Sequence, residues 1–116
     1  MAKQLTAPQR DPVAEGSTRS PAIDFTGQLD DDELLVETPS IPTVDDKGYS
    51  GDLTITGVQV NVVEIKVLNK TLLPGQAVQC VVSGFLEETG NYILEATCWT
   101  DKGNKLIGRI IMPVEA

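Results

Sequence analysis

Residues 91–104 read NYILEATCWTDKGN and contain the clearest secondary-structure signal in the chain. One set of alternate positions is apolar: Tyr92, Leu94, Ala96 and Cys98. Glu95 and Thr97 lie between them, and this period of two is typical of a β-strand with one buried face. Asp101-Lys102-Gly103-Asn104 then forms a signal for a tight turn. The pattern predicts a β-hairpin whose second strand carries Leu106, Ile110, Met112 and Val114.

The segments before this hairpin also indicate strands. Val58 to Val62 alternates apolar and polar residues, and the phase then slips, because Val63, Ile65 and Val67 continue the apolar set. Such a slip predicts a β-bulge or a strand that crosses between sheets. The segment 73–76 predicts a turn, and Val78, Cys80 and Val82 predict one face of the next strand. Short strands separated by frequent turns favour an all-β sandwich.

The chain divides into two unequal regions near Gly51. Residues 1–50 hold five of the seven prolines and ten of the 17 acidic residues. Residues 1–22 show no helical or strand period, so we predict an extended N-terminal arm there. We predict the sandwich over 23–116, with peripheral strands and loops in 23–50 and core strands in 51–116.

Residues 51–116 alone are too few for a two-sheet sandwich of this kind. We therefore expect Asp24–Val44 to supply one or two strands. The apolar positions around which we place them are Leu34, Val36, Ile41 and Val44.

Composition excludes several classes of function. The chain has 17 acidic and 9 basic residues and a formal charge of −8, which disfavours contact with nucleic acid or an anionic membrane surface. It has no histidine, which removes histidine-based catalysis and histidine metal sites. No apolar run approaches the roughly 18 residues of a membrane helix, and no secretory signal is visible. We expect neither an enzyme nor a bound cofactor or metal.

Three features have both a functional and a structural interpretation. Asp30-Asp31-Asp32-Glu33 reads as a solvated acidic turn, a contact for a basic partner, a helix-capping box or, against the usual ligand spacing, a metal site. Cys80 and Cys98 fit either an inter-sheet disulfide or two buried thiols, and a reducing compartment favours the thiols. Asn69-Lys70-Thr71 matches a glycosylation sequon but also an ordinary loop.

The order of features from Asp24 onward resembles small immunoglobulin-like virion proteins of tailed bacteriophages. The segments that carry the resemblance are Asp24-Phe25, the acidic turn before Leu34-Leu35-Val36, Val82-Ser83-Gly84, residues 89–94, residues 97–103 and the final Ile-Ile-Met-Pro-Val of residues 110–114. The layout is also similar to that of phage capsid cement, or decoration, proteins with an N-terminal arm and a β-rich body. The resemblance implies an immunoglobulin-like β-sandwich.

Together these observations predict a phage capsid cement protein on the outer surface of the virion, made in the host cytoplasm. Its expected partners are the major capsid protein and other copies of itself, with a trimer suggested only by virion symmetry. The N-terminal arm would reach across a subunit boundary. Its expected anchors are the apolar residues spaced along it: Leu5, Val13, Ile23 and Phe25.

Two alternatives remain open at this point. The first is an adaptor between head and tail or between tail and fibre, which would form a ring. The second is a free carbohydrate- or cell-surface-binding domain. Such domains usually expose aromatic platforms in loops, whereas Trp99 and Tyr92 fall within one predicted strand.

Overall fold

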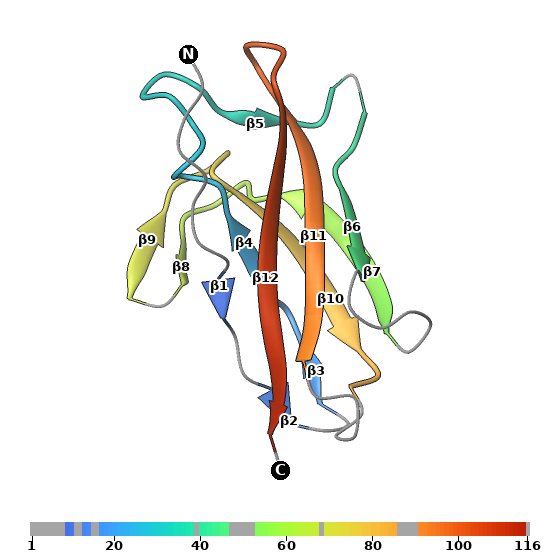
Figure 1. Cartoon of the computed structure of the whole chain (residues 1–116). Helices are drawn as coiled ribbons and strands as arrows, with labels where there is room; N and C mark the ends of the chain where they lie inside the picture. The colour runs from blue at the N-terminus through green and yellow to red at the C-terminus, as the bar shows by residue number, and fades with distance from the viewer. Residues whose placement is uncertain are drawn as a thin grey trace.

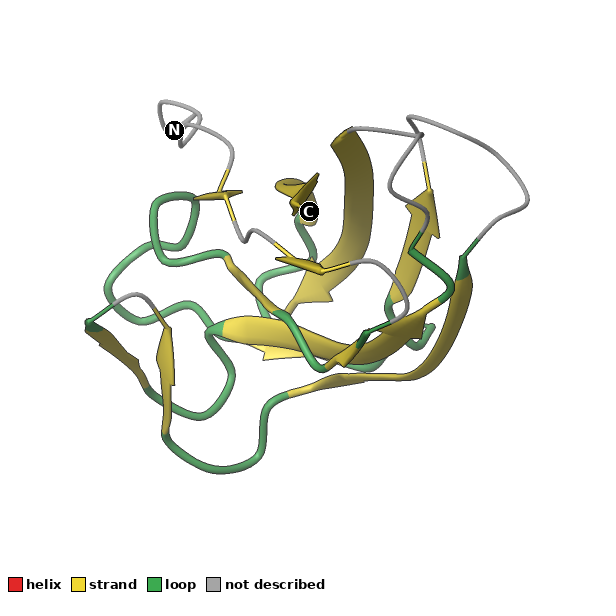
Figure 2. Cartoon of the chain, turned by 90° about the horizontal axis from the view of Figure 1, so that it is seen from below, coloured by secondary structure: helices red, strands yellow, loops and turns green. Residues whose placement is uncertain are grey.

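Two antiparallel β-sheets pack face to face in the computed structural model of the chain (Figure 1). The structure describes residues 9–10, 13–14, 17–38, 40–46, 53–67, 69–85 and 91–115. Within these ranges all regular elements are strands, joined by loops and turns (Figure 2). The sequence-based expectation of an all-β fold with two sheets is confirmed.

The first sheet is built around the predicted hairpin. Strand β11 (Asn91–Thr100) pairs with β12 (Lys105–Glu115) along most of its length, from Asn91 opposite Pro113 to Trp99 opposite Lys105. The other side of β11 binds two short strands, β5 (Leu35–Val36) and β6 (Thr43–Asp46). The prediction that 24–44 would supply strands is therefore confirmed.

The outer side of β12 pairs with the beginning of the chain. Strands β1 (Gln9–Arg10) and β2 (Val13–Ala14) run parallel to β12, with Gln9 opposite Ile110 and Val13 opposite Val114. Each ladder is only two residues long. The described part of the predicted arm thus lies along the body of its own chain.

The second sheet is centred on β10 (Ala77–Ser83). Strands β3 (Thr18–Arg19) and β4 (Ala22–Asp24) pair with one side of β10, and β7 (Thr54–Val60) pairs with the other. The β7–β10 register shifts, so that two residues of β7, Gly57 and Val58, lie opposite Cys80 alone. Gly57 has a φ of 64°, which suits a bulge that begins with a left-handed glycine.

A separate two-stranded hairpin, β8 (Ile65–Val67) and β9 (Lys70–Leu72), follows β7. Here the sequence-based interpretation was wrong in one respect. Strand β7 ends at Val60, and Val62, expected on the apolar face, is 76% exposed. The phase slip marks the end of a strand, and the bulge lies upstream at Gly57.

The core lies between the sheets and is mostly aliphatic. All four predicted inward positions of β11 are fully buried, and Ile110 and Met112 of β12 face the same core. From the second sheet, Ile23, Val78, Cys80 and Val82 pack against them. Phe85 and Tyr92 make an edge-to-face ring contact with centroids 5.5 Å apart.

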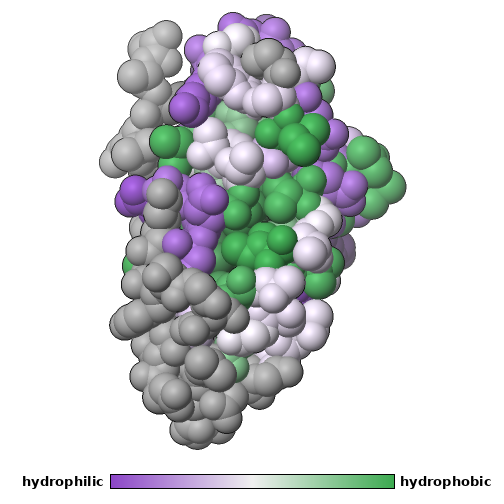
Figure 3. Space-filling view, turned by 90° about the vertical axis from the view of Figure 1, so that its right-hand side faces the viewer, coloured by the Kyte–Doolittle hydropathy of each residue, from purple (hydrophilic) through white to green (hydrophobic). Residues whose placement is uncertain are grey.

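The sandwich is less completely covered on the side of its edge strands β6 and β7. Hydrophobic residues gather in the middle of the surface seen from this side (Figure 3). Leu53, Ile55 and Val58 are only partly buried there while packing against the core. These side chains belong to the core and reach the surface at its rim.

Candidate interaction surface

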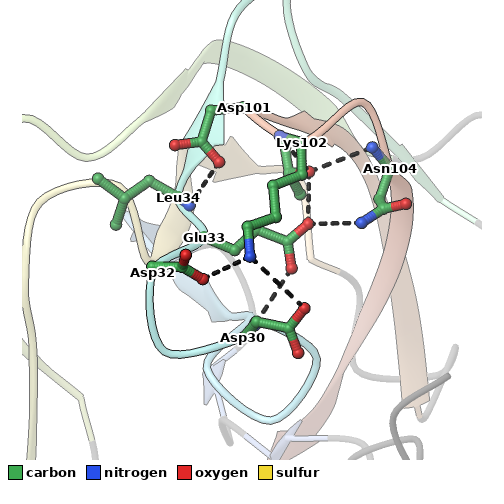
Figure 4. Close-up of polar contacts among 8 residues, drawn as sticks. Asp30, Asp32, Glu33, Leu34, Asp101, Lys102 and Asn104 are labelled. Carbon is green, nitrogen blue, oxygen red and sulfur yellow. Dashed lines mark hydrogen bonds and ion pairs between the residues drawn. The ribbon is translucent and has the colours of Figure 1, made fainter. Parts of the chain in front are cut away.

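A polar cluster joins the acidic turn to the β11–β12 turn at one end of the sandwich (Figure 4). Glu33 is its centre and is only 3% exposed. Its Oε2 accepts hydrogen bonds from Thr100 Oγ1 and Asn104 Nδ2, both at 2.6 Å, and its Oε1 accepts one from the Asp30 backbone N–H at 3.1 Å. Three donors therefore satisfy one buried carboxylate and hold the two turns together.

The exposed acids of the turn surround this buried carboxylate. Lys102 donates a hydrogen bond to Asp32 and lies 4.0 Å from Asp30. The hydrogen bond to Asp32 raises the pKa of Lys102, and the bond from Lys102 lowers the pKa of Asp32. Because these side chains are solvent-exposed, the ion pairs contribute little to stability. Asp30-Asp31-Asp32-Glu33 is thus an acidic turn in which only Glu33 is buried.

Burial raises the pKa of Glu33, but the hydrogen bonds from Thr100, Asn104 and Asp30 outweigh it, so the pKa lies below the ordinary value of 4.5. The carboxylate therefore stabilises the fold above about pH 4.5, and this contribution is lost as the pH falls through the lowered pKa. We expect Glu33→Gln to lower the free energy of unfolding at pH 7 by about 2 kcal/mol, because the amide nitrogen faces donors.

Urea unfolding at pH 7, 5 and 3 measures this effect. The difference in the free energy of unfolding between wild type and Glu33→Gln is expected to shrink toward pH 3, because the wild-type carboxylate gains its proton. The matched control is Asp31→Asn in the same turn, which is exposed and should change stability by less than about 0.5 kcal/mol. If the difference in unfolding free energy between wild type and Glu33→Gln were the same at all three pH values, the stability of the cluster would not depend on the charge of Glu33.

A second polar centre is Asn61, directly after β7. Its side chain is 1% exposed. Its Oδ1 accepts hydrogen bonds from the backbone N–H groups of Gly75, Gln76 and Ala77 at 3.0–3.1 Å. Its Nδ2 donates to the carbonyl oxygens of Val63 and Leu73 at 3.0 and 2.9 Å. Asn61 thereby fixes the loop after β7 against the turn before β10.

Four exposed apolar residues lie around Asn61 and this turn. They are Leu34 (44% exposed), Val62 (76%), Val63 (60%) and Leu73 (51%), and we call them the apolar end patch. Leu34 lies over Gly75, since a Cβ built on that glycine would be 3.2 Å from the Leu34 Cβ. Figure 4 shows the Leu34 side chain pointing away from the carboxylates of the acidic turn. The patch therefore borders the polar cluster.

The structure places the predicted arm anchors in different environments. Leu5 lies outside the described residues, and Val13 lies in β2, where only its backbone is described. Ile23 and Phe25 are 1% and 0% exposed within the core. Strand β4 and the following turn insert these two side chains between the sheets of their own chain, and their role as anchors on a neighbouring subunit stays a prediction.

The two cysteines are free thiols, and both are buried. Burial raises the pKa of each to about 11, so both are protonated near neutral pH. The interpretation as buried apolar residues is confirmed. Of the two aromatic residues considered for a binding platform, Tyr92 is completely buried and Trp99 is partly exposed.

Within the described ranges, no three acidic, cysteine or histidine side chains are grouped so as to hold a metal ion. The same residues include no helix long and apolar enough to cross a membrane. No family model matches this sequence, and comparison with curated proteins finds no significant match. Function is therefore inferred from the residues and contacts described above.

Proposed function

We propose that this chain is a capsid cement protein of a tailed bacteriophage, bound to the outer surface of the shell. The observation that carries the proposal is the pairing of the N-terminal segment with the outer edge of β12. Strands β1 and β2 are short ladders added to a hairpin that is complete without them. An added strand of this kind is exchanged between copies at low cost, because a neighbour's segment makes the same backbone hydrogen bonds.

The proposal includes an immunoglobulin-like arrangement of the sandwich. In immunoglobulin domains the second, fifth and fourth strands share one sheet, and the third, sixth and seventh share the other. The order β4-β10-β7 in one sheet and β6-β11-β12 in the other supports this assignment, if β4 is the second strand. In this assignment β1 and β2 form the first strand, and β12 is the last. The first strand then pairs in parallel with the last.

The charge of the chain supports a position outside the shell. A protein of net charge −8 is repelled by packaged DNA on the inner wall. On the outer surface it stabilises the shell by binding the assembled lattice more tightly than free subunits, which shifts assembly by mass action. The major capsid protein and neighbouring copies of this chain, as a trimer or another symmetric set, are the proposed partners. Synthesis in the host cytoplasm precedes this binding.

The number of copies per particle tests the proposal. We expect quantitative mass spectrometry of purified virions from the source of this sequence to find hundreds of copies, in proportion to the major capsid protein. A count of about a dozen or fewer would contradict cement and assign a ring-forming adaptor between head and tail or tail and fibre. Absence of the chain from mature particles would contradict both.

A further inference from the structure

Several exposed apolar side chains in the described part of the chain lie around Asn61 and the turn before β10. Among the described residues seven large apolar side chains are exposed, and four of them form the apolar end patch. They come from three separate segments of the chain, at positions 34, 62–63 and 73. Single exposed apolar residues are ordinary, but a convergence of several from distant segments marks an interaction surface.

The patch is held in a fixed conformation. The side-chain amide of Asn61 binds the carbonyl groups of both Val63 and Leu73, and the Asn61 carbonyl accepts the Gly75 N–H at 3.0 Å. The Leu35 N–H donates to the Gly75 carbonyl at 2.8 Å, which ties Leu34 to the same turn. A surface whose backbone is already ordered loses little conformational entropy when it binds.

The border of the patch is acidic. Besides the buried Glu33, the segments that carry it and the polar cluster, 30–34, 61–64, 72–76 and 101–102, contain five acidic residues and one basic residue, Lys102. Lys102 is already paired with Asp32. A two-fold contact between two copies would bring this acidic border against itself, which is unfavourable. The charge therefore selects a basic partner over a second copy.

We infer that the apolar end patch is the surface that docks this protein on its particle, and that it fits an apolar depression bordered by lysine or arginine side chains. This inference rests on the proposed function, because it takes the outer face of the shell protein as the partner. The aliphatic side chains of the patch fill the depression, while the acidic border pairs with the basic rim and orients the encounter.

The test uses shells assembled from the major capsid protein alone, with binding measured by co-sedimentation. The variant is Val62→Ser/Leu73→Ser, which removes two apolar side chains that are each more than half exposed. Its control is Ile41→Ser, at a side chain that is 65% exposed. Ile41 belongs to the connection between β5 and β6, which lies on the side of the molecule away from the β8–β9 hairpin (Figure 1). Because all three side chains are exposed, both variants should unfold at the wild-type urea concentration.

We expect the double variant to bind shells at least tenfold more weakly than wild type, with the control within about twofold. Wild-type binding should weaken between about 50 mM and 500 mM salt, where charge pairing at an exposed rim is screened. Equal binding by the double variant and the wild type would overturn the inference while leaving the proposed function intact. Failure of the wild-type protein to bind shells would overturn the proposed function itself.

Sedimentation equilibrium of the protein alone tests whether a second copy of the chain occupies the apolar end patch instead. We expect Val62→Ser/Leu73→Ser and wild type to have the same apparent mass. A wild-type dimer that this variant loses would assign the patch to a second copy and overturn the inference.

Discussion

Phe25→Ala is expected to lower the free energy of unfolding by about 4 kcal/mol, the largest effect of any single substitution proposed for this protein. Phe25 is fully buried, and its ring lies so close to β12 that a Cβ on Gly108 would be 3.0 Å from the Phe25 Cζ. Its backbone N–H also donates to the Gln76 carbonyl at 3.0 Å. Alanine keeps this backbone bond and leaves a cavity the size of a ring. Urea unfolding followed by the fluorescence of Trp99, the only tryptophan, measures the loss.

Phe25→Leu is the matched control, since it refills most of the cavity and should restore more than half of the lost stability. The comparison also separates two roles for this residue. An arm anchor would leave the unfolding midpoint unchanged when truncated and would reduce only the binding of shells. A Phe25→Ala protein as stable as wild type would therefore return Phe25 to the arm and contradict its place in the core.

The β11–β12 hairpin could be predicted in detail from the sequence, and the reason is physical. A long strand with one buried face repeats its pattern every two residues, so the facing of Tyr92, Leu94 and Cys98 follows from local order alone. The turn that follows needs one residue with positive φ, and Gly103 supplies it with a φ of 82°. Neither feature depends on knowing which other strand packs nearby.

Short strands gave no such signal. Strand β4 has three residues, too few to show a period, and the burial of Ile23 depends on its pairing with Val78, far along the chain. The N-terminal segment therefore resembled a uniform arm. Residue 22 as the boundary between arm and body stays a prediction, although Ala22 itself lies in β4.

The polar centres were equally hidden, because their partners are distant in sequence. In the sequence Glu33 is one of four adjacent acids. Besides the local bond from the Asp30 N–H, the partners that distinguish it are Thr100 and Asn104, which are 67 and 71 positions away. Asn61 read as a polar residue in an alternating strand. Its contacts with Leu73 and residues 75–77 both end β7 and expose Val62 and Val63. Local pattern therefore located the sheets but missed the apolar end patch.

Asn61→Ala is the second large effect, with an expected loss of about 3 kcal/mol in the free energy of unfolding. The substitution removes five hydrogen bonds and leaves three N–H and two carbonyl groups without this partner. The loss is smaller than the sum of five buried groups, because water reaches part of the turn once the side chain is gone. Gln59→Ala, at an exposed position near the end of β7, is the control and should change stability by less than about 0.5 kcal/mol.

Amide hydrogen exchange shows where the Asn61 effect resides. In Asn61→Ala the N–H groups of Gly75 and Gln76 should exchange faster relative to global unfolding, because each loses an acceptor on the Asn61 side chain. The backbone bonds from Gly75 N–H to the Asn61 carbonyl, from Gln76 N–H to the Leu73 carbonyl and from Asn61 N–H to the Ala77 carbonyl remain. Unchanged exchange at the Gly75 and Gln76 amides would mean that these backbone bonds hold the turn without the Asn61 side chain. Faster exchange would identify the Asn61 side chain as the group that orders the apolar end patch, and the variant should then also bind shells more weakly than Gln59→Ala.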